Sequence, residues 1–204
     1  MKIKICGITR IEDAQQCANL GADAIGFIFY PKSKRHIAPE NAKSISLSLP
    51  PFVHKIGVFV NEEIDEVNRI ACLVKLTAVQ LHGNESLEYI SQINYPVIKS
   101  FGIDGDFDFS VLAEFNNCGI ILDVKDTINF GGTGKQFDWN LIPKNIRNKI
   151  IIAGGVGINN IEEIHTNINP YGIDISSSVE VEPGIKDKDK LEKLFEKYNE
   201  LRKI

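Results

Sequence analysis

The stretch Ile150-Ile-Ile-Ala-Gly-Gly-Val-Gly-Ile158 contains the repeating unit that decides the fold. A short β-branched apolar run leads into a glycine-rich turn, and an amphipathic segment of helical spacing follows. This unit recurs about eight times, at roughly 25 residues each, which is close to the minimum for a strand and a crossover helix. The predicted strands are Lys2–Cys6, Ala24–Tyr30, Lys55–Val60, Ala78–His82, Pro96–Phe101, Gly119–Val124, Lys149–Gly154 and Gly172–Ser176.

Amphipathic segments between these strands are predicted to be helices. In Lys188–Leu201 the apolar residues form one stripe on a charged helix, and we expect the charged run Lys186-Asp-Lys-Asp-Lys190 to face solvent. The polar connection Lys125–Lys135 leads only to a short Phe137–Leu141 segment, which is typical of a functional or mobile loop. The other predicted helices are Ile11–Leu20, Pro39–Leu47, Glu62–Leu73, Ser86–Ile93, Phe107–Phe115 and Ile158–Ile168.

Alternating strands and helices predict a parallel sheet with both faces covered. Eight units favour closure into an α/β barrel of the (β/α)8 TIM type, with a doubly wound open sheet as the alternative. No Pro/Ser-rich linker or low-complexity tract marks a boundary. Residues 1–204 are therefore predicted to form a single barrel domain.

Composition argues against several classes of partner. The chain has 23 Lys and Arg against 27 Asp and Glu, so it lacks the basic excess that nucleic-acid or anionic-membrane binding requires. Its apolar stretches fall short of the roughly 20 residues of a transmembrane helix, and the first residues lack a secretory signal. The 4 cysteines include no Cys-x-x-Cys pair, which predicts reduced thiols in a cytoplasmic protein without a zinc site or a disulfide framework.

Two predicted strands end in side chains suited to acid–base chemistry, at the end of the barrel where active sites lie. Cys6 ends the first strand, where a thiol is a candidate base or nucleophile, although lone cysteines are commonly small buried apolar residues. Asp123 ends an apolar strand, and burying a carboxylate is costly unless it is hydrogen-bonded or used. The remaining cysteines lack such a position and are predicted to be structural: Cys17, Cys72 and Cys118.

Other polar residues gather at the same predicted end. Ala153-Gly-Gly-Val-Gly157 and Asp174-Ile-Ser-Ser-Ser-Val-Glu180 follow the last two strands, where many barrels bind phosphate on backbone N–H groups. Arg35 lies in Pro31-Lys-Ser-Lys-Arg-His36 and suits a carboxylate or phosphate. Gly131-Gly-Thr-Gly-Lys135 lacks the spacing of a nucleotide P-loop, and no segment has metal-ligand spacing. The pattern predicts a phosphorylated substrate.

These motifs resemble the phosphoribosylanthranilate isomerase family from end to end. The resemblance implies an enzyme of tryptophan biosynthesis that converts N-(5-phosphoribosyl)anthranilate into 1-(2-carboxyphenylamino)-1-deoxyribulose 5-phosphate, an Amadori rearrangement without cofactor or metal. The segments that carry it are Lys4-Ile-Cys-Gly-Ile-Thr9, Gly26-Phe-Ile-Phe-Tyr-Pro31, Ser33-Lys-Arg35, Val79-Gln-Leu-His-Gly83, Leu122-Asp123, Gly131-Gly-Thr-Gly-Lys-Gln-Phe-Asp-Trp139, Ala153-Gly-Gly155, Gly172-Ile-Asp-Ile-Ser-Ser177 and Val179-Glu180.

The resemblance also implies a role for each matching residue. Cys6 would be the general base and Asp123 the general acid, while Arg35 would hold the anthranilate carboxylate. Ser178 stands where a glycine is expected, and we expect a weaker phosphate contact if that glycine allowed a positive φ or a close backbone approach to phosphate. The other implied residues are Gly154, Gly155, Ser176 and Ser177 around the phosphate, Asp174 near the ribose, and Gln80 and His82 along the pocket.

Two alternatives remain open from the sequence. Another phosphosugar barrel enzyme is the first, and for a Schiff-base aldolase Lys99 is the only tempting lysine. A catalytically silent phosphate-binding module on the same fold is the second, although the presence of both Cys6 and Asp123 disfavours it. We expect a monomer by default, with a homodimer as the alternative.

Overall fold

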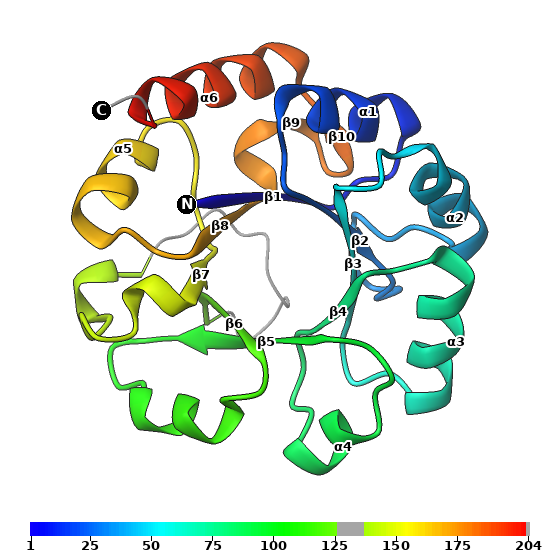
Figure 1. Cartoon of the computed structure of the whole chain (residues 1–204), viewed down its shortest axis with the longest axis horizontal. Helices are drawn as coiled ribbons and strands as arrows, with labels where there is room; N and C mark the ends of the chain where they lie inside the picture. Colours follow the sequence, from blue (N-terminus) through cyan, green and yellow to red (C-terminus); the bar gives the residue numbers. More distant parts are fainter. Residues whose placement is uncertain (126–136, 203–204) are drawn as a thin grey trace.

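A computed structural model, which describes residues 1–125 and 137–202, places eight parallel strands in a closed barrel. Neighbouring strands pair in chain order, and the last closes on the first, while helices surround the barrel (Figure 1). The predicted TIM barrel is thus confirmed and the open sheet excluded. The strands are β1 (Lys2–Cys6), β2 (Ala24–Ile28), β3 (His54–Phe59), β4 (Ala78–Leu81), β5 (Val97–Ile103), β6 (Gly119–Val124), β7 (Ile150–Ile152) and β8 (Gly172–Ile175).

Five α-helices cover the barrel at or near their predicted positions, together with one that is broken. That one, predicted over Ile158–Ile168, forms only α5 (Ile161–Glu163) and then a π-turn, η4 (Ile164–Ile168), because the Asn169 N–H donates to the Ile164 carbonyl five residues back. The others are α1 (Ile11–Leu20), α2 (Pro39–Ser48), α3 (Ile64–Val74), α4 (Leu87–Ser91) and α6 (Lys188–Leu201).

Short 3₁₀ segments replace longer helices elsewhere. The predicted helix Phe107–Phe115 is a 3₁₀ segment, η1 (Phe109–Phe115), which buries only Leu112 among its residues. One buried side chain gives too little apolar contact to favour a regular amphipathic helix. The remaining short elements are η2 (Trp139–Leu141), η3 (Arg147–Lys149), η5 (Ser177–Val179) and the hairpin of β9 (Glu180–Glu182) and β10 (Ile185–Lys186).

Most strand predictions extend too far at their carboxyl ends. β2 ends at Ile28 rather than Tyr30, and β7 ends at Ile152 rather than Gly154. Gly154 and Gly155 have φ values of +79° and +67°, which a strand does not contain. At this end the chain leaves the sheet to build loops. The predicted loop Lys125–Lys135 lies outside the described residues beyond Lys125.

Side-chain alternation along β1 determines which of its residues point into the barrel. Ile3 and Ile5 are fully buried in the apolar core, whereas Lys4 and Cys6 point to the opposite side of the strand, into the barrel. The helix α6 adds its apolar stripe to the outer core, as predicted. Within the described residues, no helix has the length and apolar character needed to cross a bilayer.

The prediction that the whole charged run before α6 faces solvent is wrong at its first residue. Lys188, Asp189 and Lys190 are exposed, but the Lys186 side chain is completely buried. Its ammonium donates to the carbonyl of Cys6 at 2.6 Å and to Glu180 at 2.8 Å. These partners compensate the cost of removing the charge from water.

Candidate active site

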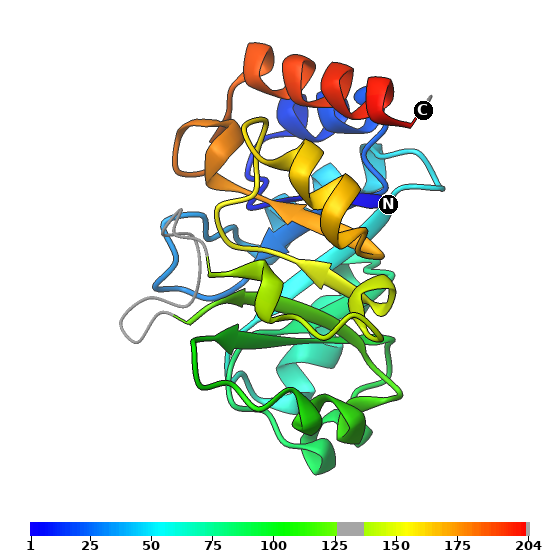
Figure 2. The same cartoon turned by 90° about the vertical axis from the view of Figure 1, so that its left-hand side faces the viewer.

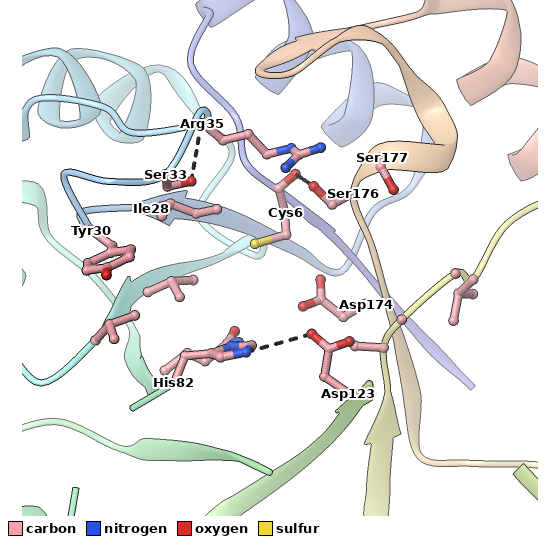
Figure 3. A pocket seen from close by; sticks show the side chains of 17 residues that line it. Cys6, Ile28, Tyr30, Ser33, Arg35, His82, Asp123, Asp174, Ser176 and Ser177 are labelled. Atoms are coloured by element: carbon pink, nitrogen blue, oxygen red, sulfur yellow. Dashed lines mark hydrogen bonds and ion pairs between the residues drawn. The ribbon is translucent and has the colours of Figure 1, made fainter. Parts of the chain in front are cut away.

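A pocket opens where the strands end, at the end of the barrel toward which the arrowheads point in Figure 2. All of the residues that the sequence analysis assigned to the site line it. They lie on the ends of different strands and on the loops that follow, so only closure of the barrel brings them together (Figure 3). The lining also includes Ile28, Tyr30, Ser33, Val58, Val60, Ala153 and Val156, which the sequence analysis did not assign to the site.

Asp123 lies near the end of β6 and is 8% exposed. Burial raises the pKa of its carboxyl to about 6, although the Val124 N–H donates to Oδ1 at 2.7 Å and favours the ionised form. A carboxyl with this pKa exists in both protonation states near neutral pH. It therefore suits a general acid.

His82 follows β4 and lies beside Asp123 (Figure 3). Burial, followed by the nearby charges of Lys99 and Lys4, lowers the pKa of its imidazole to about 4. The ring is therefore neutral. Its Nε2 lies 3.7 Å from Oδ2 of Asp123, but a neutral ring does not form an ion pair with the carboxylate. Nε2 of Gln80 lies 3.2 Å from Nδ1 of His82 and donates to Ser100 at 3.0 Å. These two contacts orient the imidazole ring.

Cys6 ends β1, and its sulfur points into the pocket (Figure 3). The residue is 7% exposed, and burial raises the pKa of its thiol, while the ammonium of Lys4 has the opposite effect. Ser176 Oγ donates to the Cys6 carbonyl at 3.2 Å, and Lys186 donates to the same oxygen. The Cys6 backbone is therefore hydrogen-bonded to the residue that follows β8 and to β10.

Arg35 reaches into the pocket from the loop after β2, while the neighbouring Lys32 and Lys34 are exposed, as expected for solubilising residues. Nε of Arg35 lies 2.9 and 3.0 Å from the two carboxylate oxygens of Glu180, and Nη2 of Arg35 lies 2.7 Å from Oε2. Burial opposes ionisation of Glu180, but Arg35 and Lys186 hold the pKa of that carboxyl below its usual range. Two cations around one carboxylate leave a net positive charge beside the pocket.

The glycine loop after β7 meets η5 on the opposite side of the pocket from β4. A side chain at Gly154 would place Cβ 2.8 Å from Oδ1 of Asp123, so only glycine fits there. Ser178 has a negative φ, so a positive φ is no reason to expect a weaker phosphate contact here. The other ground, a close backbone approach to phosphate, stays a prediction. The Ser178 hydroxyl donates to the Val156 carbonyl at 2.6 Å and joins η5 to the loop after β7.

Lys99 points away from the pocket. Its ammonium donates to the Gly83 carbonyl at 2.7 Å and to Glu85 at 3.0 Å, outside the barrel wall. In the described ranges no lysine lines the pocket, and these ranges hold no cluster of three His, Cys, Asp or Glu side chains suited to a metal. The arrangement does not support a Schiff-base aldolase.

A TIM barrel with a thiol, a carboxyl of raised pKa and a glycine-rich loop at its strand ends defines a class, the phosphosugar-converting acid–base enzymes of this fold. Residues 3–197 match the family described as N-(5'phosphoribosyl)anthranilate (PRA) isomerase. The chain belongs to this family. It is an isomerase of tryptophan biosynthesis that converts N-(5-phosphoribosyl)anthranilate into 1-(2-carboxyphenylamino)-1-deoxyribulose 5-phosphate.

Individual relatives match along nearly their whole length. N-(5'-phosphoribosyl)anthranilate isomerase of Thermotoga maritima is 45% identical over 199 residues, which cover 96% of each chain. A solved isomerase in complex with reduced 1-(o-carboxyphenylamino)-1-deoxyribulose 5-phosphate has a TM-score of 0.87 at 39% identity, covering 98% of this chain and 99% of that one. Monomers generated from the dimeric Thermotoga maritima enzyme have a TM-score of 0.86 at 37% identity, covering 98% of both chains.

Proposed function

We propose that Asp123 is the general acid and Cys6 the general base of this rearrangement. Protonated Asp123 gives its proton to the ring oxygen of the aminofuranose, and the ring opens to a Schiff base at C1. The Cys6 thiolate then removes the acidified proton from C2, which yields an enolamine. Protonation at C1 and loss of the C2 hydroxyl proton convert the enolamine into the ketone.

One observation carries this assignment. Asp123 and Cys6 lie on separate strands of the barrel but line one pocket, and burial keeps a fraction of Asp123 protonated near neutral pH. Two groups with opposite protonation requirements can then act in the same cycle. Turnover of N-(5-phosphoribosyl)anthranilate by Cys6→Ala and Asp123→Asn, followed through the loss of anthranilate fluorescence, tests the two roles.

We propose that the remaining site residues bind and orient the substrate. The two glycines of the loop after β7, with Ser176 and Ser177, surround the phosphate, which backbone N–H donors suit. Asp174 lies between Cys6 and Asp123 in Figure 3, where it would contact the ribose hydroxyls. Neutral His82 and Gln80 supply hydrogen bonds along the pocket without adding charge.

Arg35→Lys tests the proposed carboxylate contact. A lysine cannot hold Glu180 through two nitrogens and still present a planar donor to the anthranilate carboxylate. We expect KM to rise by about 10- to 100-fold, the value of one charge-assisted hydrogen bond, with a smaller change in kcat. Steady-state kinetics measure both constants, and Lys34→Gln on the same loop is the matched control because Lys34 is exposed. An unchanged KM for Arg35→Lys would remove Arg35 from substrate binding.

We also propose that two copies of this chain form a homodimer through the amino-terminal end of the barrel. Phe52 is 94% and Tyr171 56% exposed, and both border a cavity of about 280 Å³ lined by the first residues of several strands. Most of the lining of this cavity is apolar, although it also includes Lys2, Lys4, Asp23 and His54. An exposed aromatic side chain beside a mainly apolar cavity suits a self-complementary two-fold interface. The dimeric relative supports this state.

We further propose that the enzyme is cytoplasmic and has no nucleic-acid partner. The scattered cysteines support the first point, and the balance of acidic and basic residues supports the second.

Phe52→Glu tests the interface. A carboxylate at this position would have to lose its water to enter a partner's cavity, so we expect the dimer to dissociate into monomers. Light scattering after size-exclusion chromatography measures the mass, which should halve. Leu47→Glu is the control, since Leu47 is 63% exposed but does not border the cavity. A wild-type monomer at tens of micromolar protein, or a Phe52→Glu dimer, would contradict the proposal.

A further inference from the structure

Lys4 is a buried lysine close to the Cys6 thiol, and it has no part in the steps proposed above. Lys4 precedes Cys6 by two residues on β1, so both side chains point into the barrel. The Lys4 side chain is 5% exposed, and Nζ lies 2.7 Å from Oδ2 of Asp174 on β8, the residue that pairs with Lys4 in the strand register. A buried ion pair is weak evidence for stability, because desolvation offsets most of its attraction.

Gly26 shows how close Lys4 lies to the thiol. A Cβ at Gly26, on the neighbouring strand β2, would lie 2.7 Å from Sγ of Cys6 and 3.1 Å from Cε of Lys4. The two side chains therefore lie over the same glycine, close enough for the charge of the Lys4 ammonium to act on the thiol. Asp174 holds this ammonium through one oxygen, and its buried Oδ1 has no hydrogen-bond partner in the part of the chain that the structure describes.

We propose that Lys4 is a positioning residue that acts through Cys6: its ammonium stabilises the thiolate, and Asp174 holds the ammonium in place from the opposite side. The contribution of Lys4 to the reaction rests on the proposed role of Cys6 as the base. Burial disfavours the thiolate, and Lys4 has the largest effect in the other direction. A fixed cation next to the sulfur increases the fraction of enzyme molecules in which Cys6 is a thiolate and can accept a proton.

The other charged groups near Cys6 are bound elsewhere or carry the wrong charge. Lys186 and Arg35 both bind Glu180, and Lys186 also donates to the Cys6 backbone carbonyl. His82 is neutral, so it adds no positive charge. Among the described residues, the titratable groups that surround the thiol are Lys4 on β1, Tyr30 and Arg35 after β2, His82 after β4, Asp123 on β6, Asp174 on β8, Glu180 on β9 and Lys186 on β10.

The pH dependence of Cys6 alkylation tests this proposal directly. In a Cys72→Ser background, which removes an exposed thiol, iodoacetamide labelling of the Cys6 peptide is measured by mass spectrometry from pH 6 to 10. We expect Lys4→Met to slow labelling at pH 7.5 by about tenfold and to displace the curve to higher pH, because only the thiolate reacts. Lys4→Arg, which keeps the cation, should restore most of the rate.

Two further variants keep the test decisive. Lys4→Met with Asp174→Asn removes both charges, so it leaves no lone buried carboxylate if Lys4→Met does not fold, and it should also slow labelling. Lys2→Met with Asp23→Asn is the matched control, since Lys2 lies on β1 like Lys4 and its more exposed pair with Asp23 has the same 2.7 Å separation. Unchanged labelling in folded Lys4 variants would overturn the proposal. Slower labelling together with a fully active Cys6→Ala would instead keep the contact and reject Cys6 as the base.

Discussion

Replacing Cys6 by alanine is expected to lower kcat for N-(5-phosphoribosyl)anthranilate by two to four orders of magnitude, roughly the contribution of a well-placed general base. Removing the sulfur takes away the proposed proton acceptor but leaves the proposed phosphate loop and Arg35 intact. KM should therefore change much less than kcat. Loss of anthranilate fluorescence under steady-state conditions measures both constants.

The chain offers a matched control for this substitution. Cys17 on α1 is also buried, and burial raises the pKa of its thiol to about 12, but it does not line the pocket. Cys17→Ala removes the same atoms from a buried site, so it should keep full activity. A Cys6→Ala enzyme within tenfold of wild type would mean that another group takes the C2 proton.

The barrel was predictable because its determinants are local. Each strand is a short β-branched run, each helix has an apolar stripe, and a period of about 25 residues leaves few topologies besides a parallel barrel. The errors occur where tertiary contacts override the local pattern. Ile158–Ile168 has helical spacing, yet a π-turn around Ile164 interrupts it, and no spacing rule predicts that turn.

The site was predictable only for residues that stand at strand ends or in recognisable motifs. Glu180 and Lys186 contact Arg35 and Cys6 across separations of 145 and 180 residues, which no local pattern encodes. Lys4 alternates with isoleucines, and this pattern alone would equally fit a strand with a solvent-facing side. Only closure of the barrel turns that side inward, where Lys4 meets Asp174.

Burial raises the pKa values of both Asp123 and Cys6, and this has a consequence for catalysis. The roles proposed for them require Asp123 with its proton and Cys6 without one, the reverse of the order in which the two groups titrate. Between the two pKa values the competent form is a constant, small minority of molecules. The profile of kcat/KM should therefore rise with pH up to about 6, stay level, and fall above the pKa of Cys6.

Asp123→Asn should lose about two to three orders of magnitude in kcat, and its kcat/KM should keep rising with pH beyond 6, up to the pKa of Cys6, because only the thiolate then limits the competent form. The amide can keep its oxygen on the Val124 N–H, so the pocket retains its shape, but it has no proton to give to the ring oxygen. Residual activity should then lack the inflection near pH 6 that belongs to Asp123. An inflection that persists in the variant would assign this titration to another group.

The same substitution should stabilise the fold at alkaline pH. The pKa of Asp123 is raised from 3.8 to about 6, so ionisation destabilises the folded state above pH 6, by up to about 3 kcal/mol, and has no such effect below pH 4. Asp123→Asn should therefore raise Tm by several degrees at pH 8 but hardly at pH 4. Asp104→Asn is the control with the opposite sign, since Lys125 holds the pKa of that exposed carboxyl below its usual value and the variant should gain nothing at pH 8. A folded Asp123→Asn enzyme that is inactive but more stable would show that the buried carboxyl is retained at the expense of stability, because the reaction needs its proton.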